Sequence, residues 1–322
     1  MKNIMKYLAI GIAIAFVLVG VYAAMNWQNL MRLKRVNSLF DKDKIVYNFS
    51  HMSELLFADR LPRSGPMHNW PVDLKPLPET FTFEGKALNT NDILDETQTT
   101  ALVVVKDGTI VFEEYYKGTG RDDVRISWSM AKSFASALFG IAYKDGLIDS
   151  LDDPVTKYVP SLKNTAYDGA SIRNVLHMAS GVTFDEDYLA RDSDINKMGR
   201  ALALGSSLDE FAASILDTSR PAGEARQYVS IDTHVIAMAL RNATGETLQD
   251  YFVKNLWSQI GAGADAFYST DGEGNAFALG GLNIRTRDYA LFGELFREGG
   301  RSKADVGGKQ FSEFKPMLVD LA

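Results

Sequence analysis

Hydrophobic and polar positions divide the chain into an apolar N-terminal run, a turn-rich extension, and a body in which strand and helix patterns alternate. Residues 8–25, LAIGIAIAFVLVGVYAAM, carry no charge and follow Lys2 and Lys6. As a helix, these eighteen residues would span about 27 Å, close to the hydrocarbon thickness of a bilayer. Residues 1–28 are therefore predicted to form a signal anchor or signal peptide rather than a buried core helix.

An uncleaved anchor is the favoured interpretation of this run. The body would then lie outside the cytoplasm, on the periplasmic face of the inner membrane. Val21 and Ala23 would suit a signal-peptidase cut before Ala24, so a secreted form is the alternative, although the run is long for a cleaved signal. Arg32, Lys34 and Arg35, on the far side of the run, weaken the charge argument for the anchored orientation.

Residues 29–94 form an N-terminal extension rich in turn signals. Its stretch LPRSGPMHNWPVDLKPLP contains five prolines, which predicts a surface segment without regular structure. The segment TTALVVVKDGTIVFEEYY, residues 99–116, alternates around Asp107 and Gly108 and predicts a β-hairpin.

The stretch ISWSMAKSFASALFG, residues 126–140, continues into an apolar run that ends near Gly146, which predicts a helix over about 129–145. From about 151 to 264 the pattern is mainly helical. Together these elements predict an α/β fold, with an antiparallel sheet, flanking helices and an all-α subdomain, within a domain that covers residues 95–322.

Composition excludes several classes of function. The chain has 322 residues, 46% of them hydrophobic and 23% charged, which is typical of a globular protein. Its net charge of −7 and its lack of basic runs argue against a nucleic-acid partner. The absence of cysteine removes disulfides and thiol nucleophiles, and the four histidines have no metal-ligand spacing, so neither a metal nor another cofactor is predicted.

Ser129-Met130-Ala131-Lys132 spells S-x-x-K, an acylation motif of serine enzymes that recognise penicillin. In the predicted helix Ser129 lies in the first turn, where free N–H groups favour a developing anion. Lys132 lies on the same face, and burial would lower its pKa as a general base requires. The pattern alone is weak, because serine is common at helix starts and Ser312 begins a second match.

Competing sites have less support. Ser230, Asp232 and His234 suggest a Ser-His-Asp triad, but the chain has no G-x-S-x-G turn. The acidic residues 185–187 lack the calcium-loop pattern of an EF-hand and are predicted to form a solvated loop.

Further segments occur in an order that resembles the β-lactamase-related serine hydrolases, most closely the branch of the 6-aminohexanoate-dimer (nylon-oligomer) hydrolases. The resemblance covers about residues 95–300 and includes GLIDSLDDPVTKYVPSL, VLHMASGVTFDEDY, RQYVSIDTHVIAMALRNATG and GGLNIRTRDYALFGELFREGG. It implies a fold like that of β-lactamases and penicillin-binding proteins. It also implies hydrolysis of a small amide or ester through an acyl-enzyme.

The resemblance assigns residues one by one. It makes Ser129 the nucleophile, and it leaves Lys132 or Tyr228 as the base that takes its proton. Tyr188 and Ser230 would contact substrate. Penicillin-binding members have asparagine where this chain has Ser230, so linear amides or esters are favoured over β-lactams. The alternatives are a non-catalytic or weakly active penicillin-binding-type sensor, and an activity like that of a β-lactamase or DD-peptidase.

After Gly300 the resemblance ends. The remaining 22 residues contain no Lys-Thr-Gly or His-x-Gly motif, and they are too few for two or three strands of about 5 residues and a helix of about 11. The C-terminal strands of the sheet are therefore expected to be missing, as in a truncated or frame-altered product. The hairpin at 99–116 would then lack sheet neighbours, a second oxyanion donor would be absent, and the chain would be poorly soluble or weakly active.

Overall fold

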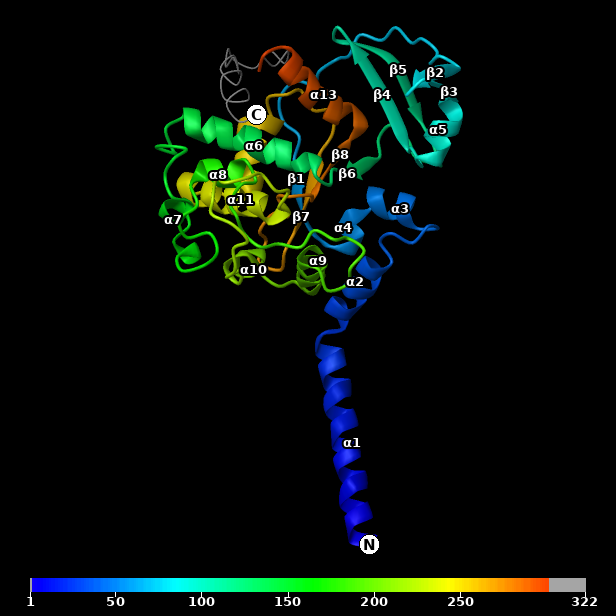
Figure 1. Ribbon diagram of the computed structural model, residues 1–322. Helices are drawn as coiled ribbons and strands as arrows, with labels where there is room; N and C mark the ends of the chain where they lie inside the picture. Colours follow the sequence, from blue (N-terminus) through cyan, green and yellow to red (C-terminus); the bar gives the residue numbers. More distant parts are fainter. Residues whose placement is uncertain (1, 301–322) are drawn as a thin grey trace.

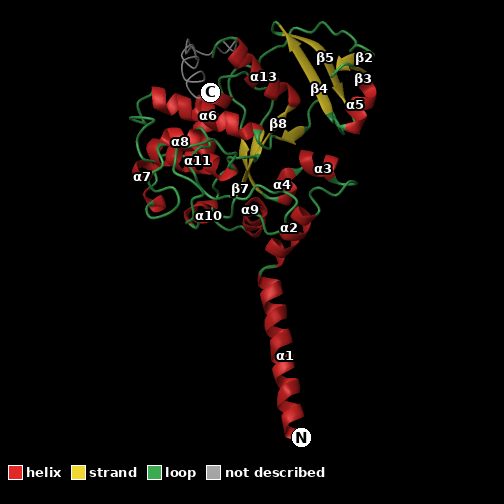
Figure 2. Cartoon of the chain, viewed as in Figure 1, coloured by secondary structure: helices red, strands yellow, loops and turns green. Residues whose placement is uncertain are grey.

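A four-stranded antiparallel sheet lies at the centre of the computed structural model, which describes residues 2–300 (Figure 1). Its strand order is β1-β7-β8-β6. The strands are β1 (Phe57–Leu61), β6 (Val124–Ile126), β7 (Ala266–Thr270) and β8 (Leu282–Arg285). The two central strands, β7 and β8, are buried along most of their length, because helices cover the sheet (Figure 2).

Strand β1 was not anticipated from the sequence. It lies within the predicted extension, yet it pairs with β7 in the register Phe57 with Thr270 and Leu61 with Ala266. Before it in the chain are the short helices α2 (Trp27–Asn37), α3 (Ile45–Ser50) and α4 (Met52–Leu55). The proline-rich stretch that follows contains no helix and, after Leu61, no strand, as predicted. The extension is therefore joined to the body through the central sheet.

The predicted hairpin is confirmed as β4 (Ala101–Lys106) and β5 (Thr109–Tyr115). Asp107 and Gly108, at φ of +51° and +76°, form the turn, and two successive positive φ values are typical of a type I′ hairpin. A second hairpin, β2 (Thr80–Phe83) and β3 (Lys86–Asn89), and helix α5 (Thr90–Glu96) precede it.

Among the residues 2–300, β4 pairs with no strand other than β5. On the other side of the hairpin, the N–H groups of Asp73 and Lys75 donate to carbonyl oxygens of β5. The strands expected after Gly300 would fall outside the described residues, so the incomplete C-terminus stays a prediction.

The predicted helix over 129–145 is confirmed as α6 (Met130–Lys144). Ala131, Phe134, Leu138 and Ala142 recur at helical spacing and are almost wholly buried. Helix α6 packs against α11 (Ser230–Thr244). It also packs against α13 (Thr286–Arg297), where the ring of Phe134 stacks on that of Phe292 with the ring centroids 3.7 Å apart. The S-x-x-K helix is thus held on two sides by the core.

The predicted all-α region is also confirmed. Its helices are α7 (Val155–Tyr158), η1 (Pro160–Leu162), α8 (Ile172–Leu176), α9 (Asp194–Leu204), α10 (Leu208–Ala213), α11 (Ser230–Thr244), α12 (Leu248–Phe252) and the π-helical turn η2 (Val253–Trp257). Every residue of α11 from Ser230 to Leu240 is buried, so this helix forms the centre of the region.

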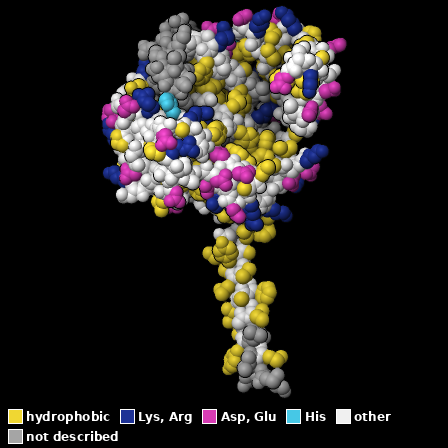
Figure 3. Space-filling view, in the orientation of Figure 1, with side chains coloured by type: hydrophobic (Ala, Val, Ile, Leu, Met, Phe, Trp, Pro, Cys, Tyr) yellow, Lys and Arg dark blue, Asp and Glu magenta, His cyan; other side chains and the backbone are white. Residues whose placement is uncertain are grey.

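Helix α1 (Lys2–Met25) projects from the body (Figure 1), and apolar side chains surround much of it (Figure 3). Its segment Met5–Met25 has a mean hydropathy of 2.5 over its most apolar window, none of which is buried. By length and composition the helix can cross a membrane, and a signal sequence at the N-terminus has the same properties.

Candidate active site

A tight turn between strand β6 and helix α6 presents Ser129. Trp128, just before it, has a φ of +43°, a left-handed conformation that costs a residue with a side chain roughly 1–3 kcal/mol. The turn is held by Ser127, whose N–H donates to the Leu282 carbonyl on β8 at 2.7 Å and whose hydroxyl donates to the Gly280 carbonyl at 3.3 Å. The central sheet thereby fixes where α6 begins.

Ser129, Lys132 and Tyr228 meet at this helix start. The Ser129 Oγ lies 2.7 Å from the Tyr228 hydroxyl oxygen and accepts a hydrogen bond from Lys132 Nζ at 3.1 Å. Lys132 Nζ also donates to the Leu279 carbonyl at 2.8 Å, which holds the ammonium beside the serine. The structure therefore brings together the three residues that the sequence singled out.

The surroundings of Lys132 and Tyr228 shift both groups toward their basic forms. Burial lowers the pKa of Lys132, opposed by the hydrogen bond and charge of Tyr228 and by the charge of Glu186. For Tyr228, burial favours the neutral phenol. Its hydrogen bonds with Ser129 and Lys132, with the lysine charge, outweigh this and lower its pKa. Neutral Lys132 and ionised Tyr228 are the two forms able to take a proton from Ser129.

Tyr188 and Ser230 are joined through a residue that the sequence did not single out. Ser230, with no exposed surface, donates its N–H to Glu186 Oε1 and its hydroxyl to Glu186 Oε2, the latter at 3.1 Å. Tyr188, 60% exposed, donates its hydroxyl to the same Oε2 at 3.0 Å. Asp185 and Asp187 are exposed, as the prediction of a solvated loop expects, whereas Glu186 is half-buried and bonded to Tyr188 and Ser230. Its one sequence signal was its place two residues before Tyr188.

The alternative triad is not formed. His234 Nε2 contacts Asp209 Oδ1 at 2.8 Å. Asp232 instead accepts hydrogen bonds from the Tyr167 hydroxyl at 2.8 Å and the Ser180 hydroxyl at 2.9 Å. Asp232 is fully buried, and this burial raises its pKa to about 7. In the part of the chain that the structure describes, no group of three or more histidine, aspartate or glutamate side chains is arranged to hold a metal ion.

The backbone N–H of Ser129 lies at the start of α6 and is a candidate donor to a developing oxyanion. Within residues 2–300 this N–H makes no hydrogen bond, and Ser129 is the N-cap residue of α6, at the helix end where the dipole favours negative charge. The second donor expected from a strand after Gly300, and the second S-x-x-K match at Ser312, both lie outside the described residues.

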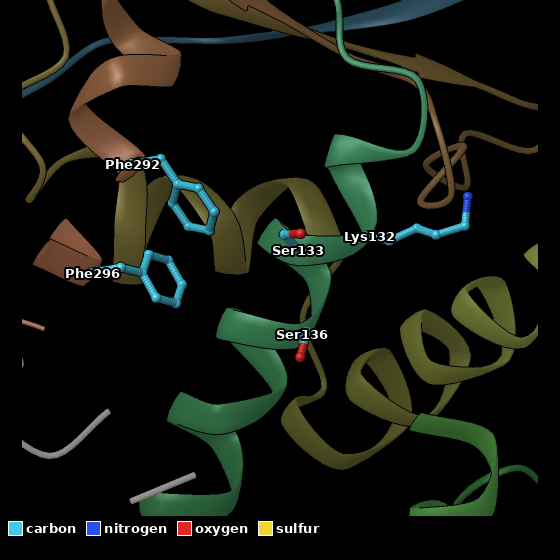
Figure 4. A pocket seen from close by; sticks show the side chains of 5 residues that line it. All are labelled: Lys132, Ser133, Ser136, Phe292 and Phe296. Atoms are coloured by element: carbon cyan, nitrogen blue, oxygen red, sulfur yellow. The ribbon is translucent and has the colours of Figure 1, made fainter. Parts of the chain in front are cut away.

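A hollow of about 410 Å³ lies beside α6 and α13 (Figure 4). Its lining residues are Lys132, Ser133, Ser136, Phe292 and Phe296. The ammonium end of Lys132 points away from the two phenylalanine rings in this view. The hollow therefore touches the stem of Lys132, whereas the nitrogen that contacts Ser129 is directed elsewhere.

Comparison with known proteins adds a family match. The model of the family described as Beta-lactamase matches residues 90–302. The 6-aminohexanoate-dimer hydrolase of Paenarthrobacter ureafaciens is 29% identical over 257 residues, which are 78% of this chain and 64% of the relative. The chain thus spans less than two thirds of that relative's length.

Solved structures show the same fold. A protein from Bacillus anthracis provisionally named 6-aminohexanoate-dimer hydrolase superposes with a TM-score of 0.78 at 24% identity, over 87% of this chain and 75% of its own. A provisionally named β-lactamase from Bacteroides dorei DSM 17855 gives a TM-score of 0.55 at 23% identity, over 70% and 66% of the two chains. These matches confirm the predicted β-lactamase-like fold of antiparallel sheets flanked by helices.

Proposed function

Because the chain belongs to the β-lactamase family of serine hydrolases, whose model matches more than half of it, we propose that it hydrolyses small linear amides or esters through an acyl-enzyme. The observation that carries this proposal is the contact of Ser129 Oγ with both Lys132 Nζ and the Tyr228 hydroxyl. A hydroxyl held between two proton acceptors is the arrangement that nucleophilic catalysis by serine requires.

The reaction follows from this geometry. Ser129 Oγ attacks the substrate carbonyl carbon while its proton passes to neutral Lys132 or to the Tyr228 oxygen. The oxyanion that forms accepts a hydrogen bond from the Ser129 N–H. As the intermediate collapses, Tyr228 supplies a proton to the leaving nitrogen or oxygen. Water then attacks the acyl carbon and gives a proton to the same groups. The bond from the acyl carbon to Ser129 Oγ breaks, the carboxylic acid leaves, and these groups return the proton to Ser129.

Replacing Tyr228 with phenylalanine is expected to lower the acylation rate at least about a hundredfold, the usual worth of a positioned acid-base group. The ring remains, but the hydroxyl 2.7 Å from Ser129 Oγ is lost. Stopped-flow acylation by p-nitrophenyl acetate measures the effect. Tyr143→Phe, a tyrosine of α6 remote from Ser129 in sequence, is the control. Acylation at the wild-type rate in Tyr228→Phe would show that its role is wrongly assigned.

The proposed substrates are linear rather than β-lactam. Support comes from Ser230, which offers a hydroxyl already bonded to Glu186 in place of an amide side chain free to meet the substrate. Further support is the name of the similar hydrolase from Paenarthrobacter ureafaciens, which describes a dimer of an amino acid.

We expect kcat/KM for p-nitrophenyl acetate to exceed that for benzylpenicillin by at least about tenfold, since one well-formed hydrogen bond is worth about that factor. The variant Ser230→Asn is expected to lower the ratio of kcat/KM for p-nitrophenyl acetate to kcat/KM for benzylpenicillin, because it introduces the side-chain amide that penicillin-binding members have at this position. Steady-state kinetics with both substrates measure it. Efficient penicillin turnover by the unmodified chain would overturn the proposed substrate class.

The rival function is a sensor that binds covalently without turnover. The two differ in one measurement: a sensor releases a single equivalent of p-nitrophenol and stops, whereas a hydrolase continues.

We also propose that α1 anchors or exports the body to the outer face of the inner membrane. The support is its apolar segment Met5–Met25, which no part of the body buries.

A further inference from the structure

Glu186 occupies a position that the reaction described above does not use. Its two carboxylate oxygens accept three hydrogen bonds, from the Ser230 N–H, the Ser230 hydroxyl and the Tyr188 hydroxyl. Both partners were predicted to contact substrate, and both are held by this one carboxylate. Glu186 is therefore a common hydrogen-bond partner of Tyr188 and Ser230.

The contact to Ser230 acts on the backbone that carries Tyr228. Ser230 is the first residue of α11 and lies two positions after Tyr228. The residue between them, Val229, caps α11 in an extended conformation and provides no side-chain hydrogen bond to the helix. Glu186 replaces that missing cap from another segment of the chain, because it accepts a free N–H of the first turn. A carboxylate is favourable there, at the positive end of the helix dipole.

The charge of Glu186 also acts on Lys132, a candidate base for Ser129. It favours the ammonium form of Lys132, and it disfavours ionisation of the buried Asp232. When Lys132 takes the Ser129 proton, a new positive charge forms in a partly buried place. A nearby carboxylate lowers the free energy of that charge. The other titratable groups facing this region are Tyr188 and Tyr228.

We propose that Glu186 is a positioning residue of the Ser129–Lys132–Tyr228 site, which holds the Tyr228 hydroxyl in place through Ser230 and balances the ammonium formed on Lys132. The proposal rests on the serine-hydrolase function. It assigns to Glu186 two separable effects, one of geometry and one of charge, and each has its own variant.

The variant Glu186→Gln removes the negative charge. It also leaves one acceptor oxygen for Ser230 and Tyr188, whose hydrogen bonds use both carboxylate oxygens in the unmodified chain. We expect kcat for p-nitrophenyl acetate to fall about ten- to a hundredfold, the usual worth of hydrogen bonds to a charged group. KM is expected to change less. The rising acid limb of the pH profile of kcat/KM should move to lower pH, because Lys132 loses its proton more readily without the carboxylate.

The variant Glu186→Asp keeps the charge and shortens the side chain. It is expected to lower kcat while the acid limb stays in place. Asp192→Asn is the matched control: the Asp192 side chain is 89% exposed and forms a 3.9 Å ion pair with Arg200. It makes the same charge change on an exposed side chain, and both kcat and the acid limb should remain as in the unmodified chain.

Wild-type kcat in Glu186→Asp, or a wild-type kcat and acid limb in Glu186→Gln, would overturn the positioning role while the hydrolase function stands. If Glu186→Gln does not fold, Glu186→Asp alone decides. An unmodified chain that neither turns over p-nitrophenyl acetate nor reacts with a fluorophosphonate would contradict the hydrolase function, and the positioning role with it.

Discussion

Ser129→Ala is expected to reduce ester hydrolysis to the background rate, a loss on the order of a millionfold in kcat when a serine nucleophile is removed. The reason is that no other hydroxyl takes its place: its Oγ alone contacts both Lys132 Nζ and the Tyr228 hydroxyl among the described residues. Steady-state release of p-nitrophenol from p-nitrophenyl acetate measures the loss.

Ser133→Ala is the matched control for this variant. Ser133 lies on the same helix, one turn further, and lines the hollow beside Phe292 (Figure 4). Its removal is expected to leave turnover within about twofold, as is usual for a surface substitution. Turnover by Ser129→Ala within tenfold of the unmodified chain would disprove the assigned nucleophile.

Lys132→Ala is expected to lower the acylation rate at least about a hundredfold and to change its dependence on pH. Burial lowers the pKa of Lys132, so the neutral amine is available below the ordinary lysine value of about 10.4. Acylation should therefore rise with pH along a limb that lies below this value, because only the neutral amine accepts the Ser129 proton. In Lys132→Ala this limb should disappear.

The pH profile of acylation by p-nitrophenyl acetate checks this prediction. Lys254→Ala is the control, since Lys254 is 64% exposed and pairs with Glu246 on the surface. An unchanged acid limb in Lys132→Ala would show that another group, such as Tyr228, is the base. In Lys254→Ala the acid limb of the pH profile should coincide with that of the unmodified chain.

Most of the elements that were predicted correctly follow from local sequence patterns. The hairpin turn at Asp107 and Gly108, and helix α6, follow from signals within a few residues of one another. Strand β1 could not be predicted in the same way. Its sequence FADRL places Asp59 and Arg60 between apolar residues, and its partner strand β7 lies about two hundred positions further along the chain. Pairing at that distance leaves no local pattern.

In the candidate site, too, some residues were predicted from sequence patterns and one was missed. The S-x-x-K spacing and a family resemblance indicated Ser129, Lys132 and Tyr228, which the structure brings within hydrogen-bonding distance. Glu186 was missed because an acidic residue in a loop is usually solvated, and nothing in the sequence shows that the first turn of α11 lies beside it. Its role depends on a tertiary contact, which spacing along the chain does not encode.

The most direct test of the proposed acyl transfer is to map the covalent adduct. The chain is treated with a fluorophosphonate, its intact mass is measured, and the modified peptide is sequenced by mass spectrometry. We predict one adduct per chain, on Ser129, and none in Ser129→Ala. An adduct that persists in Ser129→Ala, or one that maps to any other residue, would contradict the assignment of Ser129 as the nucleophile.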